Sequence, residues 1–107
     1  MDDGLSPRRA QRYQVSWPAR VRRSERDEWH PCRTVNLSVS GVLLRTHRDF
    51  EIGEQVEVEI EFLATVTSKS IIAGAGQVVR REPTVPGGAA IFFLATPSGV
   101  PDTPLAN

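Results

Sequence analysis

The sequence predicts an all-β fold: a small six-stranded antiparallel barrel of the split-barrel type, formed by a single domain. Apolar and polar residues alternate with a period of two over residues 13–22 and again over residues 56–62. Segments rich in glycine, proline and polar residues separate short apolar runs at regular intervals, as in other small antiparallel proteins. No convincing helical periodicity and no internal repeat interrupts this pattern.

The first half of the chain predicts three strands. Residues 13–22 alternate apolar and polar side chains, and Trp17 falls in the inward register, so we expect it in the core. Residues 23–30 are mostly charged and predict a hairpin loop. Two further strands are expected over residues 32–36 and 41–47, joined by a short polar turn.

The second half predicts three more strands. Gly53 lies in a turn where we expect a positive φ, and the clearest alternation in the chain follows it over residues 56–62. That strand places three glutamates on its outward, solvated face: Glu57, Glu59 and Glu61. A fifth strand is expected over residues 71–81, where Gly74 and Gly76 predict curvature or a bulge.

After a turn over residues 83–88, the nearly continuous apolar run of residues 89–95 predicts a sixth strand that is central or buried on both faces. The chain thus divides into a flexible basic arm (1–12), a barrel (13–96) and a Pro-rich disordered tail (97–107). The tail is short and interrupted by prolines, so it predicts no substantial C-terminal helix.

Composition and charge narrow the class of protein. The 107 residues suit one domain with a modest core, and no apolar run approaches the ~20 residues needed to span a bilayer. The acidic N-terminus does not resemble a secretory signal, and the single cysteine, Cys32, fits a reducing compartment, so we expect a cytoplasmic protein without membrane insertion.

The net charge of zero conceals a polarity along the chain. Residues 1–48 hold ten basic and five acidic side chains, whereas residues 49–107 hold three basic and eight acidic ones. A protein that binds nucleic acid in bulk carries a strongly basic domain, so we expect no DNA or RNA partner. A local anion site in the first half is compatible with the distribution. Nearly all the basic residues are arginine, whose planar fork suits phosphate and the O6/N7 edge of guanine, although genomic base composition also explains this bias.

One candidate motif lies ahead of the first strand. Arginines occur there at an RxxxR spacing, with Arg8, Arg9 and Arg12 in one short segment. Their guanidinium groups can form charge-assisted and bidentate hydrogen bonds with phosphate. A solvated basic tail would explain the same residues without any ligand.

A second candidate motif joins the second and third strands. Residues 36–41 form an NxSxxG turn, in which Asn36 and Ser38 are two residues apart and face the same side. We expect Gly41 to supply a position that tolerates positive φ. These residue types are also common in turns that bind nothing, but both motifs together provide the groups that an anionic purine nucleotide requires.

The order of these features resembles the PilZ domain family. Members of that family resemble this chain in three features: an RxxxR arm, a [D/N]xSxxG turn and a six-stranded barrel, which in the family binds cyclic di-GMP. The resemblance covers about residues 7–96. It extends to Gly53 ahead of the acidic strand, to residues 76–79, and to Gly88 ahead of the last strand.

The resemblance implies a site for cyclic di-GMP. In such a site, Arg8 and Arg12 would bind phosphates and the Hoogsteen edges of guanine, while Arg9 would stack on a base or bind a second copy of the ligand. Asn36 and Ser38 contact guanine or the sugar-phosphate ring, and Gly41 permits the turn between them. The implied function is a receptor whose arm becomes ordered on ligand binding and then signals by contact with a downstream protein. In this family such signals control bacterial motility, surface attachment or polysaccharide export.

Other functions remain open at this point. A PilZ-like adaptor that binds no nucleotide would share the barrel, although the retained motifs argue against it. A single-stranded nucleic-acid binder of the OB type would need a basic groove with exposed aromatics, whereas aromatic residues make up 7% of this chain. His30, Cys32 and His47 lack the close spacing of a zinc site. No nucleophile with a matching base is evident, so we expect neither a metal, nor a cofactor, nor an enzyme.

Overall fold

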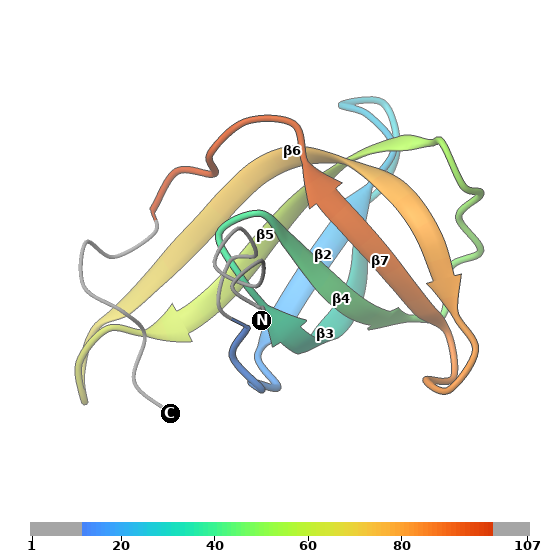
Figure 1. The fold of residues 1–107 in the computed structure, drawn as a ribbon. Helices are drawn as coiled ribbons and strands as arrows, with labels where there is room; N and C mark the ends of the chain where they lie inside the picture. Colours follow the sequence, from blue (N-terminus) through green and yellow to red (C-terminus); the bar gives the residue numbers. More distant parts are fainter. Residues whose placement is uncertain (1–11, 100–107) are drawn as a thin grey trace, which may run out of the picture.

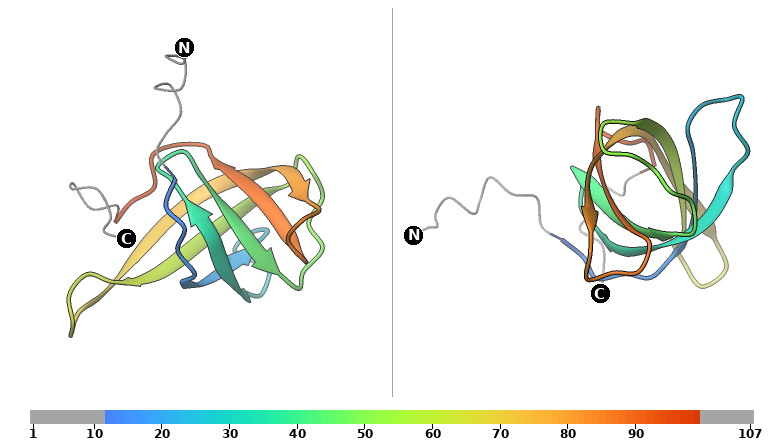
Figure 2. Two further views of the ribbon diagram at one scale, coloured as in Figure 1. Left: turned by 60° about the horizontal axis from the view of Figure 1, so that its bottom comes forward. Right: turned by 90° about the vertical axis from the view of Figure 1, so that its right-hand side faces the viewer.

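The computed structural model describes residues 12–99, which form a closed barrel of six antiparallel strands (Figure 1). In chain order the strands are β2 (Pro18–Arg22), β3 (His30–Leu37), β4 (Gly41–Thr46), β5 (Gln55–Leu63), β6 (Lys69–Glu82) and β7 (Gly88–Phe93). Around the barrel their order is β2-β3-β4-β7-β6-β5, and β2 pairs with β5 to close the ring. The right-hand view of Figure 2 shows the strands surrounding a common interior. The predicted six-stranded antiparallel barrel is therefore confirmed.

The interior is filled by the inward-facing residues of every strand. Val21, Leu44 and Ile60 have no exposed surface at all, and Phe93 from β7 and Phe50 from the loop before β5 complete this core. Burying branched and aromatic side chains in this way provides most of the stability of a small barrel. Trp17 packs against the core with its ring 5.4 Å from that of Phe62, which confirms its predicted inward position.

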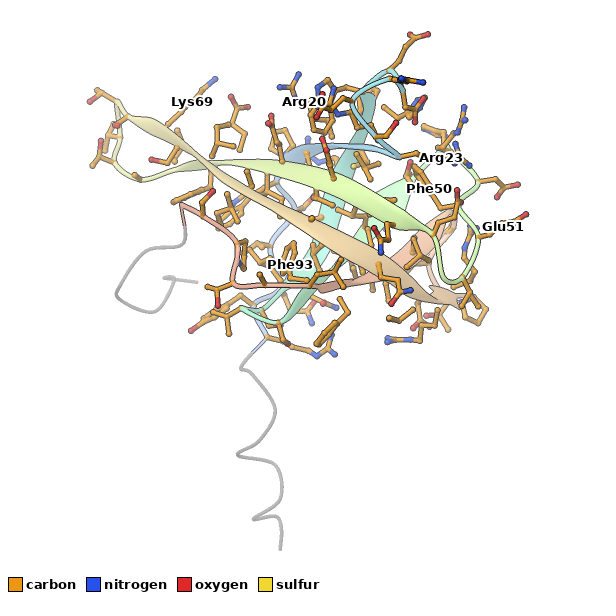
Figure 3. The ribbon with its side chains drawn as sticks, turned by 90° about the horizontal axis from the view of Figure 1, so that it is seen from above. Arg20, Arg23, Phe50, Glu51, Lys69 and Phe93 are labelled. Carbon is orange, nitrogen blue, oxygen red and sulfur yellow. The ribbon has the colours of Figure 1, made fainter. Side chains whose placement is uncertain are left out.

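The outward face of β5 carries the three glutamates that the alternation predicts, and each is paired with a cation. Glu59 accepts from Arg20 at 2.6 Å and Glu57 accepts from Arg22 at 2.8 Å, both across the β2–β5 pairing. Glu61 lies 3.6 Å from Lys69. In Figure 3, Lys69 lies near the far end of the β5–β6 hairpin, opposite the end that holds Arg23, Phe50 and Glu51.

The first strand is shorter than the predicted range of residues 13–22, since regular pairing begins only at Pro18. Residues 13–17 instead follow β3 through an isolated bridge between Tyr13 and Leu37. The Trp17 amide donates to the hydroxyl of Thr34, 2.8 Å away, rather than to a backbone carbonyl. This side-chain bond replaces one rung of the backbone ladder, which explains the break.

The two glycines of β6 do not mark a bulge, which was one of the two alternatives expected from the sequence. Pairing with β5 continues without interruption past both of them, and the irregularity of β6 lies further on, between Val78 and Arg80. Gly74 lies against Pro97, and a Cβ at Gly76 would come within 2.5 Å of Ile91. Close packing therefore accounts for both glycines.

The C-terminal boundary also differs from the expected one at residue 97. Pro97 is buried, and Ser98 exchanges backbone hydrogen bonds of 2.8 and 3.0 Å with Ala73 of β6. The chain therefore continues beside β6 as far as residue 99, and the rest of the predicted tail lies outside the described residues. Among residues 12–99 there is no helix that could cross a membrane.

Cys32 lies on β3 and packs against the core. Burial raises the pKa of its thiol to about 12, because the thiolate loses hydration in an apolar environment. The thiolate is the reactive form, so burial suppresses reaction with electrophiles at neutral pH.

We expect iodoacetamide to alkylate Cys32 at pH 8 at least about ten-fold more slowly in the folded protein than in the urea-denatured chain. Mass spectrometry of timed samples measures both rates without ambiguity, because Cys32 is the only cysteine. Equal rates would show that the thiol is open to solvent.

Candidate functional site

The two sequence motifs meet on the outer surface of the barrel. The guanidinium Nη1 of Arg12 donates to the side-chain oxygen of Asn36 at 3.1 Å, and the contact is exposed to solvent. Arg12 is the last residue of the predicted RxxxR arm, and Asn36 is the first of the NxSxxG turn. Arg8 and Arg9 lie outside the described residues.

Local pairing places Arg12 in this position. Tyr13 and Leu37 exchange backbone hydrogen bonds of 2.8 and 2.9 Å, which fixes the preceding residue beside the end of β3. Leu37 is the last residue of β3 and is buried in the core, so Asn36, the residue before it, faces outward. Arg12 and Asn36 are therefore brought together by backbone register, and their contact does not depend on the side chains alone.

Ser38 is enclosed by its own turn. It is 7% exposed, and its hydroxyl oxygen accepts from the amides of Ser40 and Gly41 at 3.3 and 3.2 Å. The backbone amide of Ser38 also donates to the carbonyl of Gly41 at 2.9 Å. Ser38 therefore holds the shape of the turn that follows Asn36, which is a common use of serine in such loops.

Gly41 does not adopt a positive φ, so the prediction made from the sequence was wrong on this point. Among the described glycines, positive φ occurs at Gly53, as predicted, and at Gly87 and Gly99. Gly41 is the first residue of β4, and a Cβ there would lie 2.5 Å from the carbonyl oxygen of Ile91. Gly41 is needed because the backbone of β7 approaches too closely for a side chain.

The cations of the barrel divide into two groups. On the β2–β5 side, arginines are matched by the glutamates of β5, and Arg23 is matched by Glu54. On the β3–β4 side, Arg12, Arg33 and Arg45 have no carboxylate within ion-pair distance in residues 12–99. We call these three residues the unpaired arginine group. Two loop residues, Arg26 and Arg48, likewise have no such carboxylate in this part of the chain.

Two members of the unpaired arginine group lie directly opposite each other. Arg33 of β3 pairs with Arg45 of β4 in the sheet register, and both are exposed. Like charges in this arrangement repel each other. Arg33 turns away and donates to the hydroxyl and carbonyl of Ser16 at 3.1 and 2.7 Å. No carboxylate of residues 12–99 therefore neutralises the positive charge of this face.

The outer face of the neighbouring strand, β7, agrees with its prediction only in part. Residues 89–95 were expected to be central or buried on both faces, and Ala89, Ala90 and Ile91 are all buried, but Phe92 is 51% and Leu94 is 50% exposed. In a closed barrel only one face of each strand meets the core, here through Ile91 and Phe93. Phe92 therefore faces outward, directly across from Gly41 in the register of β4 and β7.

The ionisable groups with shifted pKa values take part in structural contacts. The hydrogen bond from Arg23 lowers the pKa of Glu54, the backbone amide of Arg23 lowers that of Asp27, and the hydroxyl of Thr84 lowers that of Glu82. His30 lies 3.4 Å from Asp27. Residues 12–99 contain no group of three or more His, Cys, Asp or Glu side chains that would hold a metal ion.

The fold and the site together define a small barrel with an arginine-bearing leader and a polar turn on one outer face. The family model for the PilZ domain matches residues 6–95 of the chain. The chain therefore belongs to the PilZ family, a family of receptor and adaptor domains for cyclic di-GMP. No curated protein matches it.

Sequence reasoning identified Asn36 and Arg12 but missed the other residues that mark this face. Arg33, Arg45 and Phe92 lie in different strands, and only the register shows that they share a surface with the NxSxxG turn. The sequence contained one signal for Phe92. The apolar run of residues 89–95 has more apolar side chains than the single buried face of a barrel strand requires, so some of them must face outward.

Replacing Gly41 by alanine should destabilise the protein, because its new methyl group meets backbone atoms of β7 that cannot rotate away. We expect a loss of about 1–3 kcal/mol in the free energy of unfolding, measured by urea denaturation. Gly53→Ala provides the matched control, since it has open space around its Cβ and suffers only from its φ of 97°. That strain is about 1–2 kcal/mol. An unchanged Gly41→Ala protein would contradict the close approach.

Proposed function

We propose that this protein is a receptor for cyclic di-GMP that binds the nucleotide on the outer face of β3, β4 and β7. The observation that carries the proposal is the contact of Arg12 with Asn36, because it joins the arginine motif to the polar turn at one place. The unpaired arginine group around it supplies positive charge that no carboxylate of the described residues neutralises.

The chemistry of the ligand fits these groups. Cyclic di-GMP is a dianion with two phosphates, and each of its guanines offers the N7 and O6 acceptors that an arginine fork recognises. A hydrogen bond to a charged group contributes about 1.5–3 kcal/mol, so two or three arginines contribute roughly 3–9 kcal/mol toward binding. Asn36 adds an amide that can both donate to and accept from a base or sugar.

The arm completes the site in this proposal. Arg8 lies four residues ahead of Arg12, so its Cα lies within roughly 14 Å of that of Arg12 even in a fully extended chain. Arg8 and Arg9 close over the phosphates, and the ordered arm with its nucleotide forms a new surface for a downstream protein. Binding must offset the entropy lost by ordering these residues. In this function the domain acts by binding and contact, and not as an enzyme.

Isothermal titration of the protein with cyclic di-GMP tests this function. The wild-type chain should bind, and Arg12→Ala should bind about ten-fold more weakly or worse, because one charge-assisted contact is lost. The melting temperature of unliganded Arg12→Ala should stay close to that of the wild type, since the contact removed is solvent-exposed.

Arg26→Ala is the matched control, because it removes the same charge from an exposed loop residue whose side chain has no carboxylate within ion-pair distance in residues 12–99. It should bind like the wild type. Equal weakening in both variants would mean that overall charge matters and the site does not. A flat titration of the wild type would reject the receptor in favour of an adaptor that binds no nucleotide.

A further inference from the structure

Phe92 differs from every other aromatic residue of this protein in its surroundings. It is the one aromatic side chain in the exposed class among residues 12–99. Trp17 and Phe62 stack on each other. The guanidinium groups of Arg20 and Arg22 lie 4.3 and 4.2 Å from the centre of the Trp29 ring. Isolated apolar side chains on a protein surface need no explanation, but Phe92 shares its outer face with the unpaired arginine group.

The neighbours of Phe92 leave its ring accessible. On one side it is paired with Gly41, which has no side chain to cover it. On the other side it is paired with Gln77 of β6, whose amide reaches away to donate to the carbonyl of Gly53 at 3.1 Å. A flat apolar surface therefore remains open next to the NxSxxG turn.

The position of Phe92 suits a ligand with two aromatic bases. Phe92 of β7 pairs with Gly41 of β4. Asn36 of β3 pairs with Leu43, which is two residues from Gly41 along β4. Strand spacing and rise place the Cα atoms of Phe92 and Asn36 about 12 Å apart. A molecule that holds two purine nucleosides around two phosphates can span this distance while its charges stay near the unpaired arginine group.

We propose that Phe92 is a stacking platform for one purine base of the bound dinucleotide, which lies flat across β4 and β7 beside Gly41. This inference rests on the proposed function and adds to it a subsite for the base. Arginines recognise the phosphates at one end of the site, and the aromatic ring holds a base at the other. Stacking on an aromatic side chain is tolerant of sequence and strengthens binding without further charge.

Variants of Phe92 test the subsite by titration with cyclic di-GMP. We expect Phe92→Ala to bind about ten-fold more weakly than the wild type, and Phe92→Trp to bind within about two-fold of it, because tryptophan keeps an aromatic face. Leu94→Ala is the matched control, since Leu94 has nearly the same exposure and lies two residues along the same face. It should change the affinity less than two-fold, about 0.4 kcal/mol.

A second measurement separates stacking from simple apolar contact. The H8 proton of a guanine that lies on a phenyl ring shifts upfield in the NMR spectrum, and this shift should disappear in Phe92→Leu, which retains apolar bulk. Normal affinity of Phe92→Ala in a protein that binds the nucleotide would overturn the subsite while the receptor function stood, and would leave the exposed face of β7 to a protein partner. Failure of the wild type to bind would overturn both.

Discussion

Closure of the barrel by the pairing of β2 with β5 determines how charge is distributed over this protein. The pairing sets Arg20 opposite Glu59 and Arg22 opposite Glu57, so the basic first half of the chain and its acidic second half neutralise each other there. Each exposed pair adds little stability on its own. Their larger consequence is that the glutamates of β5 neutralise cations on one side of the barrel only. The arginines of the β3–β4 side are left without counter-charges in the described part of the chain.

Most of the fold could be predicted because alternation reports directly on a half-buried strand. The strand expected over residues 56–62 is observed as β5, Gln55–Leu63, and its glutamates face outward as predicted. The prediction was wrong where side chains replace backbone pairing or where packing depends on a distant segment. The bond of the Trp17 amide to Thr34 shortens β2, and Pro97 explains Gly74, but neither contact leaves a periodic signal in the sequence.

The site was predicted less completely, because it is assembled from strands that only the register brings together. Asn36 and Arg12 were identified from motifs and do meet. Residue types alone, however, could not separate a glycine that needs positive φ from one that makes room for a neighbouring strand, and Gly41 is of the second kind. The exposure of Phe92 likewise follows from ring closure, since a barrel strand in an apolar run still has one face outside.

The contact between Arg12 and Asn36 fits the anion site that we propose. A neutral amide holds the guanidinium in place without cancelling its charge, whereas a carboxylate there would neutralise it and compete with a phosphate. The hydrogen bond from the guanidinium to the amide has one charged partner, whereas a bond from the guanidinium to a phosphate has two and is shorter and stronger. Under the proposed function, a phosphate can therefore replace Asn36 as the acceptor at little cost. The backbone bridge of Tyr13 with Leu37 keeps Arg12 beside the turn whichever group accepts its hydrogen bond.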